Sequence, residues 1–136
     1  MLEQMSLLDL VSAIQNKVET RTGLKCYDAV PKNPKAPFYF AEAVGKRSDN
    51  TKSMYRDVFT VYIHCIAKPS ASSVEVYKLI RQAEEALTED IEIPQGFELL
   101  MQNENGIQTI KTDETNEKHA VISYDFTVCY GFKTKI

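Results

Sequence analysis

Hydrophobic residues near the start of the chain recur at steps of three and four positions. This spacing is typical of the apolar stripe of an amphipathic helix. Ser6 precedes the stripe and Asp9 follows three residues later, a weak form of the capping box, and Gly23 stands where a left-handed C-terminal cap is easiest. The pattern predicts a first helix over Ser6–Thr20, with a stripe formed by Leu7, Leu8, Val11, Ile14 and Val18.

A second helical pattern follows Pro69. Serines there supply capping residues, and Ser72 and Glu75 have the spacing of a capping box. The pattern predicts a helix over Ser73–Thr88. Its apolar face is expected to consist of Val76, Ile80, Ala83 and Leu87, widened by Val74 and Tyr77.

Alternating apolar and polar residues indicate strands elsewhere in the chain. Asp57–Ala67 is the clearest case, with Phe59, Val61 and Ile63 on one side and polar residues between them. Lys118–Phe132 alternates in the same way over a longer run. Four shorter strands are predicted at Leu24–Ala29, Pro37–Val44, Phe97–Gln102 and Gly106–Thr112, the last two separated by turn residues at Asn103–Gly106.

The resulting order of elements is α-β-β-β-α-β-β-β, without regular βαβ alternation. This order predicts an α+β fold, a mostly antiparallel sheet with two helices packed on one face. The length of 136 residues is close to the commonest domain size, so we expect a single domain over residues 1–136. The most polar stretch, Gly45–Arg56, cannot bury apolar surface, and we expect a mobile loop or hairpin tip at about 45–56.

Composition narrows the function classes. Hydrophobic residues make up 43% of the chain, enough for one core, and a net charge of −3 argues against a general nucleic-acid binder. Cys26, Cys65 and Cys129 are far apart in sequence, which favours reduced thiols in apolar positions and a reducing compartment. No apolar run approaches the length of a membrane span and the N-terminus lacks the shape of a signal peptide, so we expect a cytosol-like environment without membrane contact.

The chain shows no recognisable catalytic motif. His64 could act as a base or a metal ligand with Cys65, but neighbouring strand residues face opposite sides of a sheet. We therefore expect a structural His64 with a half-exposed polar tip. The acidic residues within Glu84–Glu92 fit a solvated helix end better than a metal site. The sequence predicts no catalytic residues, no metal, no cofactor and no enzymatic activity.

Basic residues concentrate in the polar loop. They can contact phosphate or an acidic partner, or they can simply keep the loop solvated. Tyr55 is the only aromatic residue close by, so sequence-specific nucleic-acid binding is not expected. The candidate interface consists of Lys46, Arg47, Lys52, Tyr55 and Arg56, with Lys32 and Lys35 as further basic residues. Strand tyrosines fit either core positions with hydroxyls at the rim or contact anchors: Tyr62, Tyr124 and Tyr130.

Three parts of the chain together resemble the small tail-completion and tail-terminator proteins of long-tailed bacteriophages. The first part is an N-terminal helix that leads through a Pro-rich turn into an aromatic strand. The second is a polar loop followed by an alternating strand and a helix, and the third is the closing strand. The first part comprises Leu7–Thr20, Cys26–Pro31 and Pro37–Phe40. The second comprises Gly45–Arg56, Val58–His64 and Val74–Leu87, and the third is Ala120–Phe126.

The resemblance implies a structural protein that forms a ring, commonly a hexamer, on the end of the tail tube. Such a ring stops tube growth and presents a surface to the head-completion or connector protein. The implied partners are other copies of the chain, the tail-tube protein and the connector, with non-specific contact to DNA passing through the ring. The implied location is the head–tail junction of a virion assembled in the bacterial cytoplasm. Two alternatives stay open, a head–tail adaptor and a small ligand-binding or regulatory α+β domain.

Overall fold

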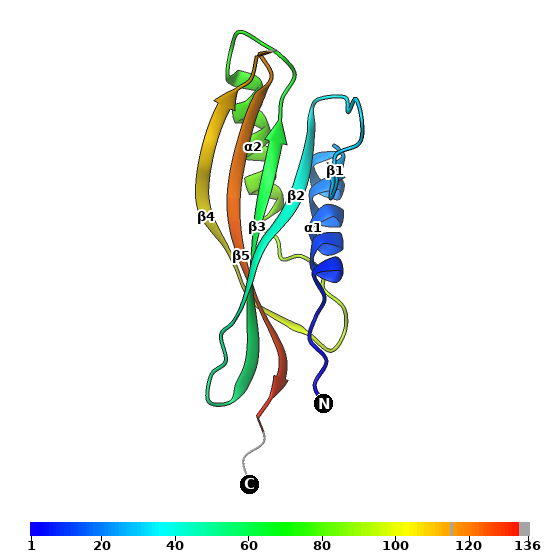
Figure 1. Cartoon of the computed structure of the whole chain (residues 1–136), viewed down its shortest axis with the longest axis vertical. Coiled ribbons are helices and arrows are strands. Elements are labelled where there is room, and N and C mark those ends of the chain that lie inside the picture. Colours follow the sequence, from blue (N-terminus) through cyan, green and yellow to red (C-terminus); the bar gives the residue numbers. More distant parts are fainter. Residues whose placement is uncertain (115, 134–136) are drawn as a thin grey trace.

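The computed structural model describes residues 1–114 and 116–133. In this part of the chain two helices lie on one side of an elongated five-stranded sheet (Figure 1). The strand order is β1-β2-β3-β5-β4, and every neighbouring pair is antiparallel except β1 and β2. The elements are α1 (Leu7–Thr22), β1 (Cys26–Tyr27), β2 (Phe38–Ser48), β3 (Met54–Ile66), α2 (Val74–Ala86), β4 (Glu98–Thr112) and β5 (Lys118–Phe132).

Helix α1 has the predicted caps. The Ser6 side chain accepts a hydrogen bond from the backbone N–H of Asp9, and Gly23 ends the helix in the left-handed conformation with φ 75°. The buried face consists of Leu10, Ala13, Ile14 and Val18, whereas the predicted stripe residues Leu7 and Leu8 are exposed. Leu7 and Leu8 instead line an open groove beside Ala41 and Ala43 of β2.

Helix α2 begins one residue later than a Ser72–Glu75 capping box would require. Ser73 occupies the N-cap position without a side-chain cap bond, and the Ser72 hydroxyl accepts from the N–H of Val74. The buried face includes Leu79, while Val74 and Tyr77 are exposed, so the predicted widening of this face was wrong. The helix turns Leu79 inward because α2 packs against α1 as well as against β3 and β5.

The prediction of two strands on either side of an Asn-Gly turn was also wrong. Glu98–Thr112 is one continuous strand, β4, which gives five strands in place of six. Its partner β5 offers fifteen consecutive residues for pairing, and β4 follows them with local register shifts, one of which lies between Glu104 and Gly106. Gly106 adopts a φ of 111° there, so the glycine serves a bulge instead of a hairpin turn.

The polar segment Gly45–Arg56, predicted as a mobile loop or a hairpin tip, forms the end of the β2–β3 hairpin and is largely strand. Gly45–Ser48 pairs with Asp57–Thr60, and Met54 and Tyr55 pair with the end of β5. Only residues 49–53 connect β2 to β3. Strand pairing satisfies the backbone groups while the polar side chains stay in water, so a sheet can continue where no apolar surface is buried.

The core lies between the helices and the sheet. The predicted alternation is confirmed, since Phe59, Val61 and Ile63 of β3 and the even-numbered residues 120–128 of β5 face the helices and are buried. Burial of each large side chain contributes roughly 1.5–3 kcal/mol. All three cysteines are free and buried, as predicted.

Candidate functional site

The β2–β3 hairpin extends the sheet beyond the helix layer at one end of the molecule (Figure 1). Arg56 stabilises its turn, because its Nη2 lies 2.6 Å from Asp49 Oδ2 and its Nε donates to the Asp49 carbonyl oxygen at 2.9 Å. The backbone N–H of Arg56 also donates to Asn50 Oδ1 at 2.9 Å. The charge of Arg56 is therefore used within the hairpin.

Lys46 compensates a buried carboxylate. Its Nζ lies 3.7 Å from Asp57 Oδ2 and donates to Gln4 Oε1 at 2.7 Å. Asp57 is buried, and Oδ2 has no hydrogen-bond partner in the structure. Since an uncompensated charge in a protein interior is costly, Lys46 has a structural role on the helix-bearing side of the sheet.

Arg47, Lys52 and Tyr55 complete the candidate interface. Arg47 lies on the opposite side of the sheet, is 63% exposed at its side chain and approaches Asp125 at 3.9 Å. Lys52 is exposed in the turn. Tyr55 is half-buried beside Tyr130, with ring centroids 5.9 Å apart. The structure thus brings the five residues onto one hairpin but divides the cations between its two sides.

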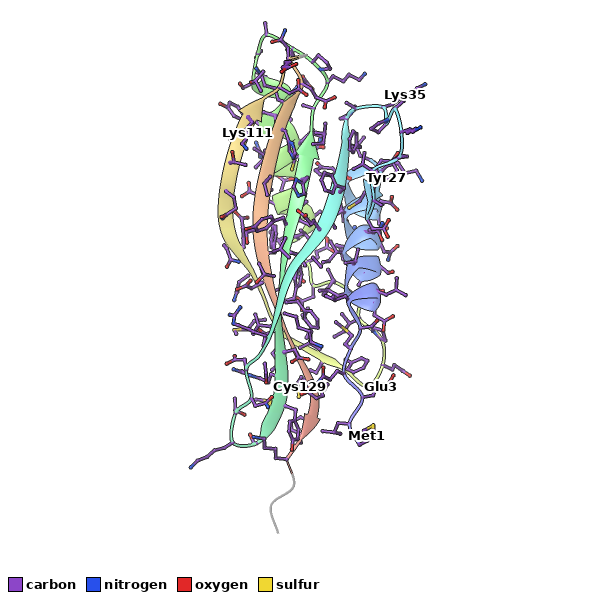
Figure 2. The ribbon with its side chains drawn as sticks, viewed as in Figure 1. Met1, Glu3, Tyr27, Lys35, Lys111 and Cys129 are labelled. Carbon is purple, nitrogen blue, oxygen red and sulfur yellow. The ribbon has the colours of Figure 1, made fainter. Side chains whose placement is uncertain are left out.

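Lys32 and Lys35 do not join this set. They lie in the loop between β1 and β2, and Figure 2 shows Lys35 at the end of the molecule opposite Met1 and Cys129. The hairpin turn lies at the same end as Met1 (Figure 1). The six lysines and arginines singled out from the sequence therefore form two separate groups.

Sequence reasoning missed a polar chain on the helix-free side of the sheet. His64 Nδ1 lies 2.8 Å from His119 Nε2, and His64 Nε2 lies 2.8 Å from Glu42 Oε1. The ring of His64 stacks on Phe40, with centroids 3.8 Å apart and planes 4° from parallel. His64 is buried, so the predicted half-exposed tip was wrong, whereas its separation from Cys65 across the sheet agrees with the prediction.

One arrangement of protons satisfies this chain when both imidazoles are neutral. His119 donates through Nε2–H to His64 Nδ1, and His64 donates through Nε2–H to the Glu42 carboxylate. Burial, together with the nearby His64 and Lys111, lowers the pKa of His119 and favours this neutral form. The chain links β2, β3 and β5 across the sheet. Its only sequence signal was the presence of both histidines on polar-facing strand positions.

A second pair of ionisable groups lies between α2 and β4. The Glu84 side chain is hydrogen-bonded to that of Glu104, and burial together with this carboxyl neighbour raises the pKa of Glu84 to about 7. The hydroxyl of the buried Tyr124 donates to Glu104 Oε1 at 3.3 Å. The pair thus joins α2 to β4 and keeps Glu84 protonated to a higher pH than an isolated carboxyl.

The comparisons with known proteins identify the family. A family model described as "Putative tail termination protein" matches residues 1–136. The chain belongs to this family. The comparison with curated proteins found no match.

A solved structure shares the fold. The chain is similar to one chain of a structure described as the virion of a native gene transfer agent (GTA) particle, with 16% identity and a TM-score of 0.69. The match covers 93% of this chain and 99% of that chain.

Membership in a structural tail-terminator family implies a role that is not enzymatic. Within residues 1–114 and 116–133, no group of three or more histidine, cysteine or acidic side chains is placed to hold a metal ion. Across the same residues, neither helix has the length and apolar character needed to cross a membrane.

Proposed function

We propose that the chain is the tail terminator of a phage-like particle. Copies of it form a ring, with six as the expected number, that caps the tail tube and joins it to the head connector. The observation that supports this function is the match of the tail-termination family model over residues 1–136. The proposed location is the head–tail junction of a virion assembled in the bacterial cytoplasm.

The surfaces of the fold suit such a ring. A ring needs two different patches on each subunit, and this sheet ends in two different strands, β1–β2 on one side and β4 on the other. The β2–β3 hairpin projects from one end and presents Arg47 and Lys52 to whatever lies above or below the ring (Figure 1). Lys46, Arg56 and Tyr55 support this hairpin through their contacts with Asp57, Asp49 and Tyr130.

Tube growth in vitro tests the proposed function. Tail-tube protein from the same genome is polymerised with and without this chain, and tube lengths are measured by negative-stain electron microscopy. A terminator stops elongation and is found by gold labelling at one end only. If the tubes continue to grow and the chain binds purified connector, the chain is instead a head–tail adaptor. If the tubes grow and the chain binds neither the tube nor the connector, both the terminator and the adaptor function are overturned.

The hairpin cations are tested by a double substitution. Arg47→Ala with Lys52→Ala removes the two charges that do not hold the turn or balance a buried carboxylate. We expect weaker tail joining with unchanged thermal stability, because surface charges far from buried partners contribute little to folding. Lys32→Ala with Lys35→Ala removes two charges at the opposite end and serves as the control. Equal loss of joining in both variants would contradict a specific role of the hairpin.

A further inference from the structure

The sheet has two open edges that differ in their surroundings. β4 pairs with β5 on one side, and no described strand lies on its other side. On the far edge, β1 covers only Tyr39 and Phe40 of β2, which leaves the outer side of Ala41–Ser48 without a strand partner. Unpaired backbone N–H and C=O groups of this kind are templates for the addition of another strand.

Both edges expose apolar side chains on the same side of the sheet. Ile107 and Ile110 of β4 pair with Ile122 and Ala120 of β5, which are core residues, so both isoleucines lie on the helix-bearing side. Each is nevertheless 44% exposed. They form an apolar ridge beside an open strand edge, a surface that a monomer has no need to expose.

The other edge offers a groove that has apolar side chains along part of its lining. Leu7, Leu8 and Val11 of α1, together with Ala41 and Ala43 of β2, form the apolar part of the lining of a groove of about 370 Å³ beside the open part of β2. The polar part of the lining consists of Ser12, Gln15, Asp28 and Glu42. Leu8 is 72% exposed. This α1–β2 groove lies on the helix-bearing side because α1 does, so it is on the same side of the sheet as the ridge on β4.

The strand directions permit these edges to meet. β2 is antiparallel to β3, β3 to β5, and β5 to β4, so β2 and β4 run in opposite directions. Copies related by rotation about an axis along the strands therefore place β4 of one copy antiparallel to β2 of the next. The helices stay on one side of the extended sheet, and repetition of this heterologous contact closes into a ring.

Charge complementarity favours β2 as the partner of β4. Ala43 and Lys46 lie on the helix-bearing side of β2 with a bulge between them, and Glu104 and Ile107 lie on that side of β4, also with a bulge between them. Antiparallel placement of Ile107 against Ala43 brings Glu104 beside Lys46. Lys46, which also lies 3.7 Å from Asp57 Oδ2, then faces the carboxylate of Glu104. Two β4 edges paired with each other would instead bring two acidic pairs together and leave the groove empty.

We propose that β4 of one copy adds as an antiparallel strand to Ala41–Ser48 of the next copy, with Ile107 and Ile110 seated in the α1–β2 groove. This assignment rests on the proposed ring and specifies which surfaces join its subunits. The sheet then continues from copy to copy around the ring.

Charge substitutions at two exposed positions test the contact. Ile107→Glu and Leu8→Lys each place a charge in the proposed apolar contact, and each is expected to weaken self-association about tenfold or more in sedimentation equilibrium. The double variant combines opposite charges across the contact and is expected to recover part of the loss. Val74→Glu is the matched control, because Val74 is 50% exposed on α2 and lies outside both edges. Thermal unfolding verifies that all variants remain folded.

Cross-linking covers the case of weak association. Ile107→Cys and Leu8→Cys proteins are made separately, mixed at millimolar concentration and treated with a short bismaleimide, while the native cysteines are buried. The expected product is the mixed dimer. Cross-links only between two Ile107→Cys copies, or none at all, would overturn the assignment, as would self-association of Ile107→Glu equal to that of Val74→Glu. If the wild type caps tubes and the edge variants cap them equally well, only this contact is refuted. If the wild type fails to cap tubes, the proposed function is refuted.

Discussion

Replacement of Glu84 by glutamine removes one carboxyl from the pair that it forms with Glu104. In the folded chain the pKa of Glu84 is raised from 4.5 to about 7 by burial and by the neighbouring carboxyl. Each pKa unit corresponds to about 1.36 kcal/mol, which sets an upper limit of about 3 kcal/mol. Because Glu84 is only partly buried and water screens the pair, we expect about 1 kcal/mol.

The sign follows from proton binding. Between pH 4.5 and about 7 the folded state keeps a proton on Glu84 that the unfolded state has released, so the free energy of unfolding falls as the pH rises. Glu84→Gln removes this dependence. The variant should equal the wild type near pH 4 to 5 and exceed it by about 1 kcal/mol at pH 8, or about 4 °C in Tm.

Urea denaturation at a series of pH values measures the effect. The difference between wild type and Glu84→Gln isolates the Glu84–Glu104 pair, because titrating groups outside this pair are common to both proteins. Glu85→Gln is the control, since Glu85 is exposed next to Glu84 and pairs with Arg81 at 2.9 Å. Parallel stability curves for the wild type and Glu84→Gln between pH 5 and 8 would refute the raised pKa of Glu84.

Two further predictions concern the sheet. The pKa of His119 is lowered in the folded state, so the unfolded state binds a proton first as the pH falls and the protein loses stability below about pH 6.5. His119→Gln should abolish part of this loss. An NMR titration of the His119 ring at or above its usual pKa would contradict the prediction. Phe59→Ala should lower the free energy of unfolding by about 3–5 kcal/mol in the same denaturation assay, because Phe59 is fully buried. Phe132→Ala is the control at an exposed position and should change this free energy by no more than about 0.5 kcal/mol.

The candidate interface was only partly predictable. The clustering of Lys46, Arg47, Lys52 and Arg56 was visible as local sequence, and the structure places them on one hairpin. Their division of labour was not visible, because it depends on Asp49, Asp57 and Asp125, and the last of these lies on a strand far along the chain. The sequence therefore shows where the lysines and arginines cluster, but their aspartate partners in the fold decide which of these cations remain available to bind another molecule.

Local features of this protein followed from the sequence alone. The caps of α1 at Ser6 and Gly23 depend on side-chain size and backbone conformation within a few residues. The alternation in β3 and β5 shows which residues face the core, because side chains on any strand point to alternate sides. These properties involve neighbours in the chain, so composition and spacing were sufficient.

Tertiary structure decided the rest. β4 is one strand and the polar segment is an extended hairpin because β5 and β3 pair with their backbones along the whole length, which overrides the turn tendency of asparagine, glycine and lysine. The Glu42–His64–His119 chain and the Glu84–Glu104 pair join residues from elements far apart in sequence. Their proximity arises from strand order and register, which are set by the burial of the whole sheet against two helices and not by any local stretch of residues.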